Sequence, residues 1–207
     1  MSPVRPKRQY WLPILFLVVL ALTRIPGLLP PNFSGVYALA FCAAIYLPGR
    51  LGWVIPLAFL LVTDLILNVF VYGTGPFSPF QLIALAGLAG IILLGRAFRA
   101  SDSWLKLLGG GVLGAMLFYL VTNTAAWLFN PFGNPEYSKD LAGWIIALTK
   151  GTGGYPQTWE FFRNTLMSGG LFTGLFVGAM KLAEAPETEP EAQPDEAAEP
   201  DPEESKA

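Results

Sequence analysis

Histidine is absent from the 207-residue sequence, and cysteine occurs once, as Cys42 within an apolar run. Without histidine, the chain has no Ser-His-Asp or Cys-His catalytic arrangement, no histidine-ligated zinc or haem, and no HExxH motif. A single cysteine excludes an intramolecular disulfide and a cysteine metal site. No other pair of a nucleophile and a base is visible, so we expect no enzyme activity, no metal ion and no cofactor.

Charged residues are also scarce. They make up 14% of the chain, whereas hydrophobic residues make up 53%; an ordinary soluble domain has roughly 25% charged residues. The charges are unevenly distributed: residues 183–207 carry ten acids and one lysine, and residues 1–182 carry five acids and twelve bases. This composition predicts an integral membrane protein whose first partner is the lipid bilayer, and it gives no indication of nucleic-acid binding.

The apolar residues form six segments, which predict an all-α bundle of about six transmembrane helices. A helix needs about 20 apolar residues to cross the hydrocarbon. The first segment resembles a signal peptide, but no small-residue cleavage site follows it, so we expect it to be a span. The second segment is short, and if it does not cross the membrane the count falls to five. The segments lie near residues 10–22, 35–48, 51–72, 80–98, 105–129 and 160–182.

Two regions fall outside the expected spans. The segment 130–159 is too polar to cross, but its apolar part, Asp140 to Thr149, predicts a short helix that lies on the outer surface or folds back as a lid. Residues 183–207 are rich in proline and glutamate and lack aromatic residues, so we expect an acidic, disordered cytoplasmic tail. The chain is therefore divided into a transmembrane domain, residues 1–182, and this tail.

The loop charges predict the orientation. With both termini in the cytoplasm, the outer loops hold only Lys139 and Lys150, with Arg24 and Arg163 at outer helix ends. This distribution is typical of a multi-pass protein of the bacterial inner (plasma) membrane. The bases on the cytoplasmic side are then Arg5, Lys7, Arg8, Arg50, Arg96, Arg99, Lys106 and Lys181.

Polar side chains recur within the expected spans, and all fall in the outer half of the bilayer. Four-residue spacing places them on single helix faces in the third and fifth spans, and others begin the sixth span or follow the first. We predict that they line a substrate pocket open to the outside, with aromatic walls. The candidate substrate-binding residues are Arg24, Asn32, Asp64, Asn68, Tyr119, Asn123, Trp127, Arg163 and Asn164.

The alternative is that the same residues hold the helices together. Asp64 is the only acid well inside a span, and such a group faces a partner or a watery cavity. It would then pair with Arg24 or Arg163, and Asn123 would hydrogen bond between helices. Small residues at four-residue spacing allow close helix packing, and Gly170, Gly174 and Gly178 are the best candidates for contact with another membrane subunit.

Several segments, in order, resemble an uncharacterised bacterial membrane family related to the substrate-binding (S) components of energy-coupling factor (ECF) transporters. The resemblance covers roughly residues 20–180, and its most specific part is Arg163-Asn164-Thr165-Leu166. After that part, the chain has Ser168-Gly169-Gly170 where the family has Gly-Asp. The other segments are Arg24-Ile25-Pro26 through Pro31-Asn32-Phe33-Ser34, Thr63-Asp64-Leu65, Thr122-Asn123 before Trp127, and Phe161-Phe162.

This resemblance implies a six-helix protein that captures a small molecule or ion from outside. It also implies docking on a shared transmembrane coupling subunit driven by ATPases. The alanine-rich docking motif of S components is absent from the first span, and Ala40 and Ala44 in the second are the nearest equivalent. The expected function is therefore a solute-binding subunit of an ECF-like importer. The alternative is a non-transporting scaffold or envelope-assembly protein with the same bundle.

Overall fold

The structure is a computed structural model that describes residues 11–184. Within this range the chain forms seven α-helices and one π-helical turn, and no strand, so the all-helical prediction is confirmed. The predicted tail, from residue 185 onward, lies outside the described residues. The elements are α1 (Trp11–Leu22), α2 (Val36–Tyr46), α3 (Leu51–Ile66), η1 (Leu67–Val71), α4 (Pro79–Gly95), α5 (Trp104–Phe129), α6 (Leu141–Thr149) and α7 (Thr158–Glu184).

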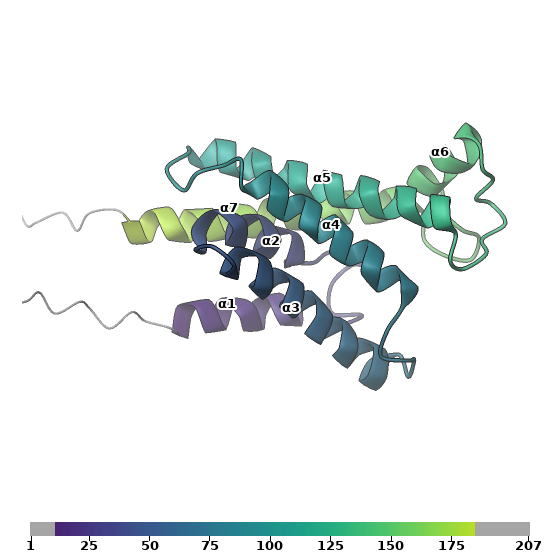
Figure 1. Cartoon of the computed structure of the whole chain (residues 1–207), viewed down its shortest axis with the longest axis horizontal. Helices are drawn as coiled ribbons and strands as arrows, with labels where there is room; N and C mark the ends of the chain where they lie inside the picture. The colour runs from purple at the N-terminus through teal and green to yellow at the C-terminus, as the bar shows by residue number, and fades with distance from the viewer. Residues whose placement is uncertain (1–10, 185–207) are drawn as a thin grey trace, which may run out of the picture.

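The short helix α2 lies at the centre of the bundle (Figure 1). It packs against α3, α4, α5 and α7, and its residues from Val36 to Ala43 are all buried. A helix that is apolar on every side needs such surroundings. With 11 residues, α2 is only about 17 Å long, shorter than the roughly 30 Å hydrocarbon core.

Three helices are long and apolar enough to cross a membrane: Leu51–Val71, which joins α3 to η1, Trp104–Phe129 and Thr158–Ala183. α2 and α4 are apolar but shorter. Large apolar side chains are exposed along these helices, for example Val54 and Val62 on α3 and Leu175 on α7. Apolar surface of this extent is compatible with a membrane protein.

The six longer helices run in alternating directions along the bundle (Figure 1). α1 begins and α7 ends at one end of the molecule, and α6 lies at the opposite end. The loops at the first end carry Arg50, Arg96 and Arg99, and Lys181 in α7 donates to the carbonyl oxygen of Ala100 there. These bases therefore lie at the end where the chain enters and leaves the bundle, whereas Arg24, Lys139, Lys150 and Arg163 lie toward the opposite end.

Glycines allow α5 to approach its neighbours closely. A Cβ atom at Gly111 would lie 2.3 Å from Oγ1 of Thr173 in α7, and one at Gly110 would lie 2.5 Å from Cζ of Phe41 in α2. Both distances are far too short, so the packing of α5 depends on the missing side chains.

The glycine face of α7, which we expected to contact another subunit, is occupied within the chain. Gly170 lies against Val112, and Gly174 lies against Trp104, both in α5. The indole Nε1 of Trp104 also donates to the carbonyl oxygen of Gly174, at 3.2 Å. The glycines therefore serve the contact between α5 and α7.

Candidate functional site

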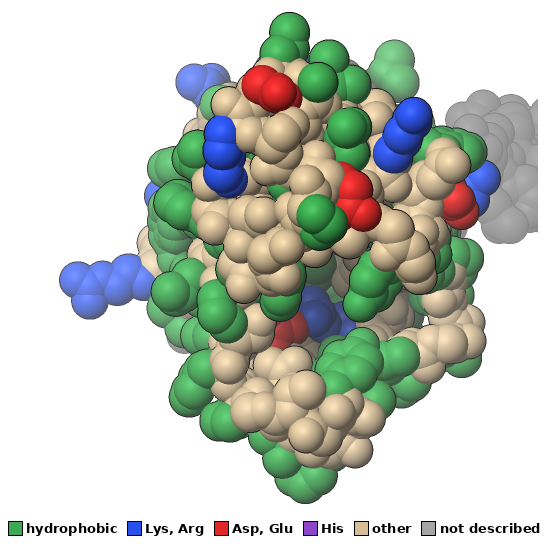
Figure 2. Space-filling view, turned by 90° about the vertical axis from the view of Figure 1, so that its right-hand side faces the viewer, with side chains coloured by type: hydrophobic (Ala, Val, Ile, Leu, Met, Phe, Trp, Pro, Cys, Tyr) green, Lys and Arg blue, Asp and Glu red, His purple; other side chains and the backbone are tan. Residues whose placement is uncertain are grey.

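A cavity of about 780 Å³ lies in the half of the bundle remote from the start of α1. It is lined by the loop after α1, by α2, α3, η1, α4 and α5, by the loops around α6 and by the start of α7. In a space-filling view of the end that carries α6, a hollow with an acidic and a basic side chain inside it is visible (Figure 2). The only charged residues among those that line the cavity are Arg24 and Asp64.

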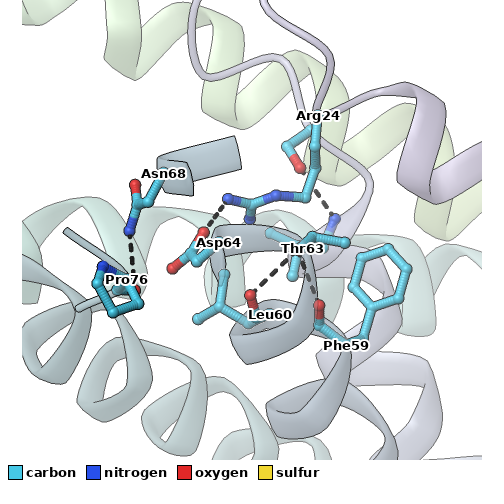
Figure 3. A network of polar contacts seen from close by, with 9 residues as sticks. Arg24, Phe59, Leu60, Thr63, Asp64, Asn68 and Pro76 are labelled. Carbon is cyan, nitrogen blue, oxygen red and sulfur yellow. Dashed lines mark hydrogen bonds and ion pairs between the residues drawn. The ribbon is translucent and has the colours of Figure 1, made fainter. Parts of the chain in front are cut away.

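Arg24 and Asp64 form an ion pair between the guanidinium Nη2 and the carboxylate Oδ1. Their side chains are 17% and 16% exposed. Figure 3 shows Arg24 reaching from the loop after α1 toward Asp64 on α3. Of the two arginine partners that the sequence allowed for Asp64, the structure therefore selects Arg24.

The position of Arg24 follows from the way in which its loop leaves α1. The preceding hydroxyl, Thr23 Oγ1, donates to the carbonyl oxygen of Leu20 at 2.6 Å and accepts from the backbone N–H of Gly35 at 3.0 Å. The loop is thus tied at both ends. Further along it, the carbonyl oxygen of Pro31 accepts from Nδ2 of Asn164 in α7, at 2.9 Å. These bonds hold the loop against the bundle.

On the other side of the cavity, the π-helical turn η1 follows directly on α3. Asp64 lies just before this turn, and Asn68 lies within it. The backbone of Asn68 accepts from the N–H of Thr74 at 2.8 Å, and its side-chain Nδ2 donates to the carbonyl oxygen of Pro76 at 3.4 Å. Asp64, Asn68 and Tyr72 all line the cavity, as their four-residue spacing predicts.

The α5 wall contributes Thr122 and Asn123. Both side chains are bonded within their own helix. The Thr122 hydroxyl donates to the carbonyl oxygen of Phe118, and Asn123 Nδ2 donates to that of Tyr119 at 2.9 Å. Asn123 therefore needs no partner from another helix. Its amide oxygen accepts no hydrogen bond from any described residue.

Of the nine predicted site residues, five line the cavity and four do not. Those that line it are Arg24, Asn32, Asp64, Asn68 and Asn123. Those that do not are Tyr119, Trp127, Arg163 and Asn164.

The four remaining residues have structural partners. The Tyr119 hydroxyl donates to the carbonyl oxygen of Leu148 at the end of α6, and Trp127 Nε1 donates to that of Ser138. These bonds attach the segment around α6 to α5. Asn164 holds the loop after α1, as described above, and Arg163 stacks over the ring of its neighbour Trp159 at 5.5 Å.

Gln81, in the first turn of α4, was not predicted from the sequence. Its side chain lines the cavity although the residue is only 6% exposed. In the sequence, Gln81 stands out as the single polar amide of an otherwise apolar helix. Such a group is costly in a membrane unless it faces a partner or a watery cavity. Most of the aromatic wall was not predicted as part of the site either: Phe33, Tyr37, Phe80, Phe118, Phe132, Tyr137, Tyr155 and Phe161.

Two acids, Glu136 and Asp140, lie in the segment just before α6. Asp140 caps α6, and the backbone N–H of Gly143, followed by the hydroxyl of Ser138, lowers the pKa of Asp140. The backbone N–H of Gly153 lowers the pKa of Glu136. Among the described residues, no three histidine, cysteine or acidic side chains are grouped as metal ligands.

Residues 5–192 match a protein family described as a family of unknown function, DUF6580. No curated protein and no solved structure matches the chain.

Proposed function

The chain belongs to the family DUF6580, and we propose that it is a membrane-embedded solute-binding protein. In this proposal, the six longer helices cross the bacterial inner membrane with both termini in the cytoplasm. The cavity then opens to the outer side, because it lies in the half of the bundle remote from the start of α1. A small molecule or ion enters from there and is held between the loop after α1, α3, α4 and α5.

The cavity itself carries the proposal. Its volume of about 780 Å³ lies within the range of roughly 300–1,000 Å³ that is usual for small-molecule sites. Polar groups from separate elements converge on it, namely Arg24 from a loop, Asp64 from α3 and Asn123 from α5, among aromatic side chains. An apolar surround with a few convergent polar groups is typical of a binding site.

A role as the solute-binding subunit of an ECF-like importer is the finer part of the proposal. Its support is the resemblance of the sequence to S components, which dock on a coupling subunit. The nearest equivalent of their docking motif is not available on the surface: Ala40 is fully buried, and Ala44 lies against Gly95 of α4. A coupling subunit would therefore contact a different face from the one that the sequence indicated.

The second candidate is a scaffold or envelope-assembly protein, and one observation favours it. The four predicted site residues that do not line the cavity all contact other parts of the protein, as Asn164 does Pro31 and Tyr119 does Leu148. A scaffold would need these contacts, but it would have no need of an open cavity with a charged pair inside. We therefore place it second.

The experiment is a screen for solutes that raise the melting temperature of the purified full chain in detergent. We expect at least one solute among vitamins, nucleobases and metal ions to stabilise the wild type. Ala126 lines the cavity, so Ala126→Phe should fill part of it and abolish the stabilisation.

Ala125→Phe is the matched control. Ala125 is the neighbouring residue on α5, and it lies on a shallow outer groove of that helix and not on the cavity. This variant should keep the response of the wild type. The proposal fails if no solute stabilises the wild type, or if both variants respond as the wild type does.

A further inference from the structure

The charge of the cavity restricts what it can bind. Arg24 and Asp64 are the only charged residues among its lining, and they neutralise each other in an ion pair. A charged solute would lose its hydration on entry without gaining an unpaired counter-charge, which is costly. An uncharged solute avoids this cost.

Two hydrogen-bond donors beside this pair make no hydrogen bond of normal geometry. Arg24 Nε is buried and makes no hydrogen bond. Gln81 Nε2 is also buried without a hydrogen bond of normal geometry, although its amide lies next to the carboxylate of Asp64. Gln81 lies in the wall of the cavity and is only 6% exposed. Buried donors of this kind are rarely left unpaired, because an unmade hydrogen bond is expensive.

The same place also offers acceptors. The Asp64 carboxylate accepts hydrogen bonds only, and the Asn123 amide oxygen faces no described donor. Aromatic rings stand around them: those of Tyr37 and Phe118 are 4.9 Å apart, and Phe80 lies nearby on the cavity wall. Such rings favour a flat, conjugated partner.

We infer that the cavity takes an uncharged, planar ligand with an amide-type edge, in which a carbonyl oxygen and an N–H lie side by side. The carbonyl oxygen of the ligand accepts from Arg24 Nε and from the Gln81 amide, and the N–H of the ligand donates to Asp64. This assignment rests on the proposed function, because it names the class of solute that the same cavity binds.

Three pyridine compounds test the assignment, since they share a ring and differ in the charge of one substituent. At pH 7, nicotinamide is a neutral amide, nicotinic acid is an anion and 3-(aminomethyl)pyridine is a cation. The shift in melting temperature of the full chain, titrated with each compound, gives its dissociation constant. We expect nicotinamide to bind the wild type about tenfold more tightly than either ion.

Substitutions within the pair should change this order in a defined way. Asp64→Asn leaves Arg24 without its counter-charge, so nicotinic acid should become the best ligand. Arg24→Gln leaves Asp64 alone, so 3-(aminomethyl)pyridine should become the best. The double variant Arg24→Gln/Asp64→Asn is neutral again and should restore the preference for nicotinamide. It keeps the test valid if a single variant does not fold.

The inference is overturned if the wild type binds either ion as tightly as nicotinamide, or if none of the three compounds binds. The two proposals fail separately. A wild type that prefers an ion still binds a solute, so it contradicts only the amide assignment. A wild type that no solute in the broad screen stabilises contradicts the proposed function as well.

Discussion

Arg24, in the loop after α1, and Asp64, near the end of α3, form an ion pair between positions 40 residues apart in the sequence. The pair lies inside the cavity and ties the loop to α3. It therefore has two consequences: it fixes one wall of the cavity, and it makes the interior neutral.

The first prediction concerns the stability that this pair provides. Arg24→Gln or Asp64→Asn alone should lower the free energy of unfolding by about 1.5–3 kcal/mol, because each leaves a largely buried charge without its hydrogen-bonded partner. The double variant should cost less than the sum of the two. Unfolding in detergent measures all three.

The control for the first prediction is the ion pair of Lys106 and Asp102, four residues apart at the other end of the molecule, in which the lysine side chain is 56% exposed. Lys106→Gln should cost at most about 0.5 kcal/mol, as is usual for such pairs. An equal loss in Arg24→Gln and Lys106→Gln would show that the cavity pair is no more important than a surface one.

The second prediction separates two asparagines that the sequence placed in one group. Asn164 is buried and bonds to Pro31 in another element, whereas Asn123 bonds only within α5. Asn164→Ala should lower the free energy of unfolding by about 0.5–1.5 kcal/mol. Asn123→Ala should leave the melting temperature almost unchanged and weaken solute binding. Equal melting temperatures for the two variants would contradict this distinction.

The third prediction concerns the contact between α5 and α7. Gly111→Ala would push a methyl group into Thr173, with a gap of 2.3 Å to its Oγ1, and should destabilise the chain by about 1–3 kcal/mol. Gly109, two residues earlier, has no atom within 4 Å of its Cβ position. Gly109→Ala should therefore be neutral or stabilise the helix by up to about 1 kcal/mol. If Gly111→Ala and Gly109→Ala have the same melting temperature, α5 and α7 do not approach each other as closely as described.

The fourth prediction follows from the lowered pKa of Asp140 at the start of α6. A carboxylate whose pKa is lower in the folded state stabilises that state above its unfolded pKa of about 3.9, and this contribution is lost as the pH falls toward the folded pKa. The difference in melting temperature between the wild type and Asp140→Ala should thus be constant near neutral pH and shrink below about pH 4. A difference that does not depend on pH would exclude the charge as its cause.

The fifth prediction is the orientation of the bundle. In a Cys42→Ser background, a cysteine at Ser101 should be protected from an impermeant thiol reagent added to intact cells, and a cysteine at Gly133 should react. The two positions lie in loops at opposite ends of the helices. Labelling of position 101 from outside would contradict the six-span arrangement.

Much of the fold could be predicted from the sequence, because the length and spacing of apolar runs determine where membrane helices begin and end. The short helix after Asp140 was also predicted, from its polar boundary and apolar interior. The central position of α2 could not be predicted. A short helix that is apolar on all sides is equally typical of a partly inserted segment, and only its neighbours decide between the two.

The candidate site was predictable only in part. Four-residue spacing placed Tyr119, Asn123 and Trp127 on one face of α5, but that face is shared between the cavity and the segment around α6. Tyr119 and Trp127 bond to carbonyl oxygens around α6, and only Asn123 is left on the cavity. Periodicity identifies a face of a helix; it does not identify what covers that face.

The central claim is that the cavity holds a solute, and native mass spectrometry of the purified full chain tests it most directly. The wild type and Ala125→Phe should carry a small molecule of the same mass, distinct from detergent and lipid, and Ala126→Phe should lack it. If none of the three proteins carries such a mass, or if Ala126→Phe carries it as fully as the wild type, the cavity is not a solute-binding site.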